Sequence, residues 1–436
     1  MSLSTEAQSL LLAATDHNLL LLRSLLKSHT PNVQDPSTLR TPLHLAIASF
    51  ETNPLPLPSN QVPNHTNGSN GASIERKEDE LSLPPLTKAT KTLELLLQNG
   101  AIWNSLDINN ETPGCIAYRL GLKELYEVMV DAGVRAELLF GRLDGYMALD
   151  DEDDDEDGDE EEMDEDAIID ISTEQNKDTQ EGIEEEEAPE LVSTEQTALE
   201  KATEEAIPVT SDVYLSSTLS IDDDKILDED KNGVMMSWES HIMSLTVQHL
   251  LTPAIPTGPK ILNIGYGMGI IDSYFQSSSP TPSSHHIIEA HPQILQKLST
   301  SPLSKNPNVT IHSGKWQEIL PKLINDGDVT FDAIYFDTFA EDYSQLKLFF
   351  TEYVIALLNP EGKFGFFNGL GADRQIAYDV YKKVVDIDLL EAGLETEWIE
   401  VEVDSKKMEG DGEWKGVRRK YWDLEKYWLP VSRFIG

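Results

Sequence analysis

The C-terminal half of this 436-residue chain is predicted to fold as an α/β domain with an open, doubly wound sheet. Short runs rich in β-branched and aromatic residues alternate with helical stretches from about residue 212 onward. The first run, residues 260–264, leads directly into closely spaced glycines, which is typical of such sheets. A recurring helical pattern before residue 150 predicts a separate all-α domain ahead of this sheet.

Seven strands with helices between them are expected in the α/β domain. The strand candidates are residues 260–264, 286–289, 309–312, 333–336, 363–367, 397–403 and a terminal apolar stretch near 428–435. The helices fit residues 270–276, 292–300, 316–324, 343–358 and 373–390. The last two strands are joined without a long helix, so we expect a seven-stranded, Rossmann-like sheet.

An ankyrin-like repeat pattern runs through the helical region. Residues 41–46, TPLHLA, are close to the signature T-P-L-H-x-A that begins a repeat, and residues 112–117, TPGCIA, echo it. A second-helix pattern recurs, so that Gly100 and Gly133 are separated by about 33 positions, the ankyrin period. The alternative is a helical hairpin with a chance match to the signature.

An inserted loop and a capping pair complete this region, which we assign to residues 1–149. Residues 51–86 are rich in Pro, Asn and Ser and are expected to form a loop between two helices of one repeat. Such length is tolerated because the entropy of closing a loop grows only logarithmically with its length. Residues 4–15 and 18–28 are expected to form an initial helical pair that caps the stack.

Charge is distributed very unevenly along the chain. Much of the net charge of -45 lies in residues 150–166 and 181–190. Residues 150–209 are therefore expected to be a disordered acidic linker, with a weak helix at 194–206. A chain this acidic repels phosphate backbones, which disfavours nucleic acid as a direct partner. It favours a basic protein, because complementary charge steers association.

Cysteine usage and hydropathy favour a reducing compartment. Cys115 is the only cysteine, so no disulfide can form within the chain. No uncharged apolar run approaches the roughly 20 residues that a bilayer-spanning helix needs. We expect a protein of the cytoplasm and nucleus without a membrane partner.

The glycine-rich turn after the first strand predicts a nucleotide-sized crevice. Gly265, Gly267 and Gly269 form a G-x-G-x-G motif, in which the missing Cβ atoms allow tight turning and close approach of a ligand. Glycines after a strand are often plain turn formers, so this motif alone is weak. Glu289 ends the second strand about 20 residues later, where an acid hydrogen-bonds ribose hydroxyls. These features allow both NAD and S-adenosylmethionine.

Residues further along the chain favour the methyl donor. Trp316 follows the third strand, where an aromatic ring packs against adenine, although a core position suits a tryptophan nearly as well. Asp337 ends the fourth strand and is expected to face the crevice, with a helix N-cap shared with Thr338 as the alternative. Glu239 lies in a Met-rich stretch, where an acid needs a cationic partner or ligand to offset its desolvation. A solvated acid at a helix start is the alternative there.

Two carboxylates flanking such a crevice suit a guanidinium group. This cation is charged at physiological pH and its lone pair is delocalised, so a nitrogen must be oriented and relieved of a proton before it attacks a sulfonium methyl. Glu239 and Asp337 can clamp the planar cation, localise charge on the far nitrogens and accept the proton. This chemistry requires no metal, and the histidines show no ligand spacing.

Five motifs together resemble the guanidinoacetate methyltransferase-related group. They are residues 234–239 (VMMSWE), 264–269 (IGYGMG), 287–289 (IIE), 314–316 (GKW) and 336–339 (FDTF). Within that group the chain is most similar to the fungal protein arginine methyltransferases that act on the δ-nitrogen. Those enzymes add an N-terminal ankyrin-like region and end in a segment like residues 419–430 of this chain. The resemblance implies that residues 210–436 form a seven-stranded S-adenosylmethionine-dependent methyltransferase domain.

The resemblance also implies roles for individual residues. Glu289 is expected to bind ribose, the Gly265 loop the methionine moiety and Trp316 the adenine, whereas Glu239 and Asp337 bind the substrate guanidino group. The expected binding set for S-adenosylmethionine, and for its product S-adenosylhomocysteine, is Met243, Gly265, Tyr266, Gly267, Met268, Gly269, Glu289, Ala290, His291, Gly314, Lys315, Trp316 and Asp337. Residues 240–242 (SHI) depart from the Thr-Pro that the family commonly has there, which leaves the shape of the substrate entrance open.

The expected function is methylation of the δ-nitrogen of an arginine in a basic protein, with a ribosomal protein suggested by the family tie. The δ assignment rests on the resemblance alone. A small-molecule guanidino methyltransferase is the nearest alternative, which the ankyrin-like region opposes because such repeats build extended surfaces for proteins. A non-catalytic scaffold is opposed by the presence of both acids. An NAD-linked dehydrogenase requires an acid–base pairing that the sequence does not show.

Overall fold

The computed structural model describes residues 3–52, 83–150, 210–251, 257–325, 327, 329–410 and 412–436. The expected inserted loop lies largely outside the described residues, and the acidic linker and its weak helix at 194–206 lie outside them almost entirely. Met1–Arg142 and Thr210–Gly436 belong to one compact unit. Among the residues that the structure describes, no helix combines the length and the apolar character needed to cross a membrane.

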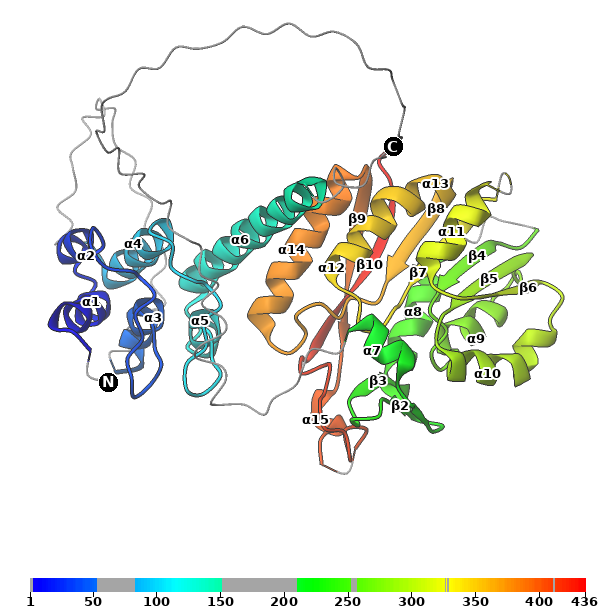
Figure 1. Cartoon of the computed structure of the whole chain (residues 1–436), viewed down its shortest axis with the longest axis horizontal. Helices are drawn as coiled ribbons and strands as arrows, with labels where there is room; N and C mark the ends of the chain where they lie inside the picture. The colour runs from blue at the N-terminus through cyan, green and yellow to red at the C-terminus, as the bar shows by residue number, and fades with distance from the viewer. Residues whose placement is uncertain are drawn as a thin grey trace, which may run out of the picture. The chain divides into compact units, whose positions relative to one another are not determined.

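In the described part of the N-terminal region the chain forms six helices (Figure 1). They are α1 (Thr5–Thr15), α2 (Leu19–Leu25), α3 (Pro42–Thr52), α4 (Pro85–Gln98), α5 (Pro113–Arg119) and α6 (Lys123–Asp150). The expected initial pair is confirmed by α1 and α2, which begin where the side chains of Ser4 and Asn18 accept hydrogen bonds from free backbone N–H groups. The ends of α3 and α4 also bracket the expected inserted loop.

The TPLH turn at the start of α3 joins two segments that are distant in sequence. The buried His44 ring accepts a hydrogen bond at Nδ1 from the Thr41 backbone N–H at 3.1 Å, and Nε2 donates to the Glu111 carbonyl at 3.0 Å. The ring therefore ties the turn before α3 to the turn before α5. This contact gives the repeated sequence signature a structural role.

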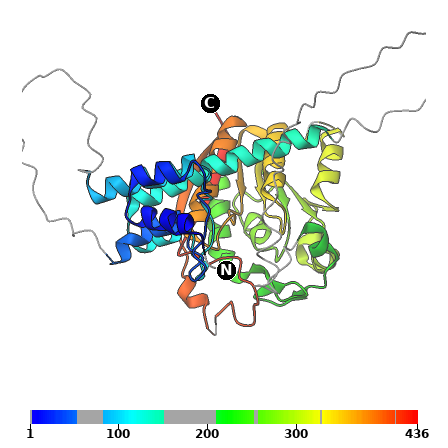
Figure 2. The ribbon, with the colours of Figure 1, turned by 60° about the vertical axis from the view of Figure 1, so that its left-hand side comes forward.

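The last N-terminal helix is longer than the repeat pattern predicts. Gly100 follows the end of α4 with a φ of +84°, whereas Gly133 lies within α6, which runs on to Asp150 and extends past the other helices (Figures 1 and 2). A Cβ on Gly133 would lie 2.6 Å from Cγ2 of Val380. Gly133 therefore permits a close helix contact rather than ending the helix.

The C-terminal region contains the predicted seven-stranded sheet, in the order β6-β5-β4-β7-β8-β10-β9. The strands are β4 (Lys260–Ile264), β5 (Ser284–Glu289), β6 (Val309–Ser313), β7 (Phe331–Phe336), β8 (Leu358–Phe366), β9 (Leu394–Glu402) and β10 (Lys426–Phe434). The first five are parallel, and β10 is antiparallel to both β8 and β9. The strand order reverses between β4 and β7, which is where such sheets bind ligands.

Helices cover both faces of this sheet (Figure 1). They are α8 (Ser240–Leu250), α9 (Ile270–Gln276), α10 (Pro292–Thr300), α11 (Trp316–Asn325), α12 (Tyr343–Leu348), α13 (Ile355–Leu357) and α14 (Gln375–Glu391), and a short α15 (Ser405–Met408) lies between β9 and β10. The single helix expected at 343–358 is interrupted, because residues 349–354 form a π-helical turn between α12 and α13. The other four helices match their predicted ranges closely.

A small second sheet precedes β4 and was not predicted. Its antiparallel strands are β1 (Ser220–Ile221), β2 (Lys225–Leu227) and β3 (Gly233–Met236). These runs are too short to show a clear period of two, so no strand pattern could be recognised in them. A short helix, α7 (Ser211–Ser216), lies ahead of this sheet, and a 3-10 turn, Ser237–Glu239, follows it.

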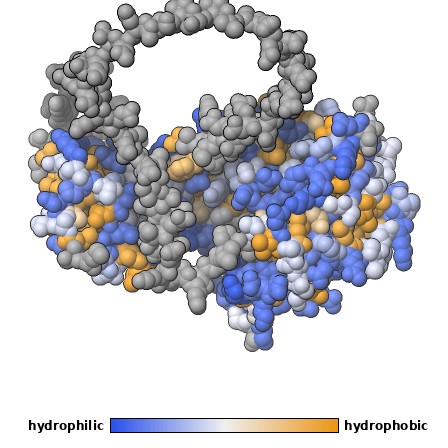
Figure 3. All heavy atoms as spheres, in the orientation of Figure 1, coloured by the Kyte–Doolittle hydropathy of each residue, from blue (hydrophilic) through white to orange (hydrophobic). Residues whose placement is uncertain are grey.

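Helix α14 belongs to both hydrophobic cores. Its residues Ile376, Val380 and Val384 are buried in one cluster with side chains of the N-terminal helices, and Val385 and Leu389 are buried in the cluster on the sheet. On the face shown in Figure 3, exposed hydrophobic residues are interspersed among hydrophilic ones. The core of the N-terminal region is therefore continuous with a helix of the α/β domain.

Candidate active site

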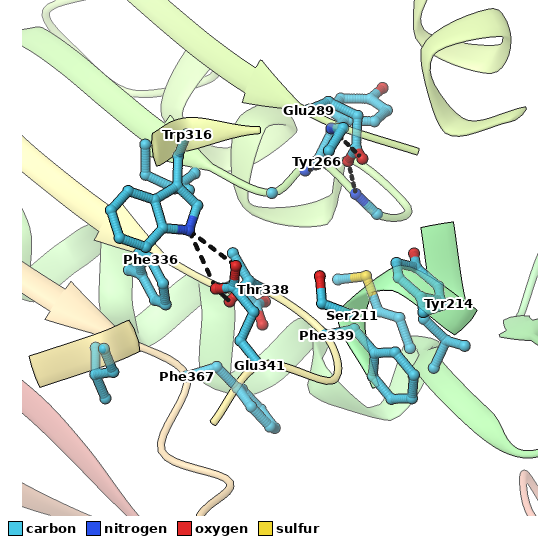
Figure 4. Close-up of a pocket in the computed structure, with 18 of the residues that line it drawn as sticks. Ser211, Tyr214, Tyr266, Glu289, Trp316, Phe336, Thr338, Phe339, Glu341 and Phe367 are labelled. Atoms are coloured by element: carbon cyan, nitrogen blue, oxygen red, sulfur yellow. Dashed lines mark hydrogen bonds between the residues drawn. The ribbon is translucent and has the colours of Figure 1, made fainter. Parts of the chain in front are cut away.

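A cavity of about 280 Å³ opens at the carboxyl ends of β4, β5, β6 and β7, where the strand order reverses (Figure 4). Its walls come from the glycine turn after β4, the end of β5, the start of α11 and the segment after β7. Helix α7, the turn after β3 and the segments at 367–370 and 421 close the remaining sides. The predicted crevice is therefore present at the predicted edge of the sheet.

The glycine turn adopts backbone conformations that other residues rarely accept. Gly265, Gly267 and Gly269 have φ values of +89°, +52° and +74°. A Cβ on Gly265 would lie 1.9 Å from the carbonyl oxygen of Asp337, so the turn can pack against the end of β7 only because this residue lacks a side chain. Gly265 and Gly267 line the cavity, whereas Gly269 caps α9 and does not.

Glu289 fastens this turn to the end of β5. Its Oε2 accepts hydrogen bonds from the backbone N–H groups of Tyr266 at 2.9 Å and Gly267 at 3.4 Å (Figure 4). Its Oε1 accepts from Ala290 at 2.8 Å and His291 at 2.7 Å. Burial raises the pKa of Glu289 although these four bonds favour its charged form. The carboxylate lines the cavity at the predicted position.

Trp316 serves the core and the cavity together. Its ring packs edge-on against Phe336 at 5.8 Å and Phe349 at 5.5 Å, and it also lines the cavity. Its Nε1 donates to both carboxylate oxygens of Glu341 at 3.1 Å, and Thr338 donates to Glu341 Oε2 at 2.6 Å (Figure 4). The sequence interpretation missed Glu341, which fixes the orientation of the indole.

Glu239 is held firmly inside the protein. It ends the 3-10 turn after β3, is only 2% exposed, and accepts hydrogen bonds at Oε1 from the Met236 backbone N–H at 3.0 Å and from the Tyr421 hydroxyl. Burial raises the pKa of Glu239 to about 7, although both hydrogen bonds favour its charged form. The alternative of a solvated acid at a helix start is therefore wrong.

Asp337 lines the same cavity as Glu239. Its backbone N–H donates to the carbonyl of Ile264 at 2.8 Å, directly beyond the end of β7. Burial, followed by the negative charges of Glu239, Asp272 and Glu289, raises the pKa of Asp337 well above its ordinary value. The N-cap alternative is wrong, because α12 begins after Asp342.

Acidic groups dominate the electrostatics of this cavity. Glu239, Glu289, Asp337 and Glu341 all line it. Among the described residues on its walls, Lys315 is the only Lys or Arg, and its Nζ is 2.7 Å from Asp212. Two acids in one partly desolvated cavity favour a bound cation, because the cation stabilises their charged forms and relieves their mutual repulsion.

Most of the predicted site residues meet at the cavity. Its walls include Glu239, Met243, Gly265, Tyr266, Gly267, Glu289, Ala290, Gly314, Lys315, Trp316 and Asp337. Three predicted cofactor residues do not line it: Met268, Gly269 and His291. The His291 ring packs instead against Tyr214, and the Met268 backbone N–H points to the Met235 sulfur at 3.1 Å.

Several lining residues lie outside the sequence-based set. They are aromatic or acidic and come from segments remote from the glycine turn: Tyr214, Phe339, Glu341, Phe367 and Tyr421. Tyr421 belongs to the terminal segment on which the family resemblance partly rests. The sequence therefore marked this segment but indicated no role for Tyr421 in the site. For Tyr214 no sequence signal pointed to the cavity.

Comparison with known proteins identifies related sequences over nearly the whole chain. The family model described as guanidinoacetate N-methyltransferase matches residues 219–419. Protein arginine N-methyltransferase 2 of Aspergillus fumigatus is 49% identical over 435 residues, covering 98% of this chain and 96% of that protein. The protein of the same name from Neurospora crassa is 46% identical over 461 residues, covering 99% and 96%.

Solved structures give a weaker likeness. An O-methyltransferase from Bacillus cereus in complex with SAH is 14% identical, covers 46% of this chain and 82% of its own, and has a TM-score of 0.33. A score this low carries no conclusion about this chain.

Proposed function

This chain belongs to the protein arginine N-methyltransferase 2 family, and on that premise we propose that it transfers a methyl group from S-adenosylmethionine to an arginine guanidino group of a protein. The observation that carries the proposal is the position of Glu239 and Asp337 on the walls of one cavity, beside the glycine turn after β4. A nucleotide-sized site and an anionic clamp for a guanidinium thus share one space.

The lining residues suggest how each reactant is held. We assign the ribose hydroxyls to Glu289, the methionine moiety to the turn at Gly265 and Gly267, and the adenine to Trp316. The guanidinium is assigned to the carboxylates of Glu239 and Asp337, which accept hydrogen bonds from its planar N–H groups. Holding both reactants in line can lower the barrier by roughly 7–11 kcal/mol.

The two carboxylates also suit the proton transfer that the reaction needs. The attacking nitrogen forms a bond to the methyl carbon, the carbon–sulfur bond breaks, and its electron pair stays on the sulfur of S-adenosylhomocysteine. The nitrogen loses one proton, for which a carboxylate with a raised pKa is the acceptor. Burial raises the pKa of Glu239 to about 7, which suits proton transfer near neutral pH, and burial also raises the pKa of Asp337.

We further propose that the methylated atom is the δ-nitrogen and that the substrate is a basic protein, with a ribosomal protein as the first class to test. The δ assignment and the ribosomal class follow from the resemblance of the sequence motifs. The basic character is supported by the net charge of -45 and by the acidic cavity walls.

One assay tests these assignments together. The full-length protein is incubated with methyl-labelled S-adenosylmethionine and either a basic ribosomal protein fraction or free guanidinoacetate. The label is expected in protein, and acid hydrolysis is expected to release δ-methylarginine. Label in guanidinoacetate alone would instead support a small-molecule enzyme, and ω-methylarginine would overturn the δ assignment.

A further inference from the structure

Tyr421 contacts the proposed guanidinium clamp from a segment beyond the residues that the family model matches. It lies between β9 and β10, just beyond residues 219–419. Its hydroxyl donates to Glu239 Oε1, and its side chain lines the cavity. Within the part of the chain that the structure describes, both hydrogen bonds to the Glu239 carboxylate reach Oε1, which leaves Oε2 for the substrate cation.

The backbone around Tyr421 is anchored to the strand that leads to Glu239. The Arg418 N–H donates to the Lys231 carbonyl at 2.9 Å, and the Gly233 N–H donates to the Arg419 carbonyl at 3.0 Å. These bonds fasten the C-terminal segment to the start of β3, a few residues before Glu239. Tyr421, which donates the hydroxyl hydrogen bond, and Glu239, which accepts it, therefore lie on two backbone segments that are hydrogen-bonded to each other.

The ring of Tyr421 is confined on several sides. It stacks on Trp238 with centroids 6.0 Å apart and meets Trp414 edge-on at 5.2 Å. A Cβ on Gly233 would lie 3.0 Å from the ring. Because these contacts leave the ring little freedom, its hydroxyl reaches Glu239 in a fixed direction.

The hydrogen bond from Tyr421 favours the charged form of Glu239. The titratable groups that interact with Glu239 are Asp337, Tyr335, Tyr427 and Tyr421. Burial raises the pKa of each of the three tyrosines well above its ordinary value, so their hydroxyls stay neutral. Burial raises the pKa of Glu239, and the hydrogen bonds from the Tyr421 hydroxyl and the Met236 N–H oppose this rise.

We propose that Tyr421 is a positioning residue for methyl transfer, which orients the Glu239 carboxylate so that it can receive the guanidinium. This proposal rests on the proposed function of Glu239. It assigns a specific task to the segment between β9 and β10: completing the substrate side of the cavity.

The test compares Tyr421→Phe with Tyr274→Phe. The control removes a tyrosine hydroxyl that lies 2.8 Å from Ser240 Oγ, next to Glu239, without touching the carboxylate. Methyl transfer to protein is measured from pH 6 to 9, with S-adenosylmethionine affinity followed by calorimetry. For Tyr421→Phe we expect kcat/KM at pH 7 to fall roughly tenfold or more, as for loss of a hydrogen bond to a charged group. The acidic limb of the profile should move to higher pH, with cofactor affinity unchanged.

A profile for Tyr421→Phe that matches the wild type, or an equal shift in Tyr274→Phe, would overturn the positioning role. Replacing Tyr421 with a fluorotyrosine keeps the ring and strengthens the donor, so the acidic limb should move to lower pH; this variant decides the question if Tyr421→Phe does not fold. Glu239→Gln separates the two proposals. If Glu239→Gln is inactive while Tyr421→Phe is normal, only the positioning role of Tyr421 is contradicted. An active Glu239→Gln would contradict the proposed role of Glu239 in binding the guanidinium.

Discussion

Individual residues in the cavity are held in different ways. Glu239 is fixed through its side chain, by bonds from Met236 and Tyr421, whereas Asp337 is placed by its backbone, whose N–H bonds to Ile264. The Asp337 carbonyl also packs on Gly265. The two acids of the proposed clamp are therefore held by separate parts of the fold. A substitution at either acid tests a different set of contacts.

Neutral amides in place of the two acids should remove the clamp without changing its shape. For Glu239→Gln and Asp337→Asn we expect kcat/KM to fall at least about 100-fold, the usual scale for losing a positioned proton acceptor. Glu239→Gln should keep its affinity for S-adenosylmethionine within a few-fold by calorimetry. The exposed Glu352→Gln is a charge-matched control. Near-normal turnover in either cavity variant would count against the clamp.

The raised pKa of Glu239 has a consequence for stability. An acid whose pKa is higher in the folded state binds its proton more tightly there than in the unfolded chain, between about pH 4.5 and 7. The free energy of unfolding of the substrate-free protein should therefore fall as pH rises through this window, by up to roughly 3 kcal/mol from this group. Urea unfolding at pH 5 and pH 8 should show a smaller fall for Glu239→Gln. An equal fall in the free energy of unfolding of both proteins would show that Glu239 is not the source of this pH dependence.

Some site residues could be predicted from their residue type and their position in the chain alone. Glu289 and Asp337 follow strands whose carboxyl ends meet at one edge of a parallel sheet, so their convergence was foreseeable. Tyr214 and Phe339 pack against each other at the cavity, a contact set by tertiary folding that no local pattern records. His291 has the expected place in the chain, but its ring is turned toward Tyr214.

Among the elements, α14 connects the two regions of the compact unit. Two glycines allow close approach of the N-terminal helices to it: Cβ atoms on Gly114 and Gly133 would lie 2.6 Å from side-chain atoms of Ile376 and Val380. Polar contacts also join α14 to the N-terminal helices, including a hydrogen bond from the Tyr126 hydroxyl to Asp379 at 2.5 Å. Lys383 also pairs with Asp131 at 3.0 Å.

Gly133→Ala tests this helix contact, with Gly141→Ala in the same helix as its control. The added methyl at residue 133 overlaps Val380, so we expect a loss of about 1–2 kcal/mol in the free energy of unfolding. Residue 141 faces open space, so alanine there should stabilise the helix by about 0.5–1 kcal/mol. Chemical unfolding measures both. Equal effects of the two substitutions on the free energy of unfolding would show that the contact between α6 and α14 is not tightly packed.

Elements with strong local patterns were predictable, and short ones were not. All seven strands of the main sheet were expected because each is a short run that contains β-branched or aromatic residues. The π-helical turn at Phe349–Val354 was missed because a single turn with i→i+5 hydrogen bonds leaves no recognisable pattern in the sequence. Gly133 lies one ankyrin period after Gly100, but it lies within α6, where the missing side chain allows close packing against Val380.

For the whole molecule, the shared core implies that the catalytic region depends on the N-terminal helices. Ile376, Val380 and Val384 are buried among side chains of those helices. A fragment comprising residues 210–436 should expose this apolar face of α14, and we expect it to melt at lower temperature and to aggregate more readily than the full chain. Calorimetry with light scattering measures both. A fragment as stable and monodisperse as the full chain would contradict this dependence.

The arrangement of the two acids around a guanidinium can be observed directly in a crystal structure of the protein with S-adenosylhomocysteine and an arginine-containing substrate peptide. The predicted result is a guanidinium with N–H groups within about 3 Å of carboxylate oxygens of both Glu239 and Asp337. The nitrogen to be methylated should face the sulfur, at a distance that leaves room for the methyl group between them. An arginine bound elsewhere, or a cofactor outside the cavity at the glycine turn, would contradict the proposed function.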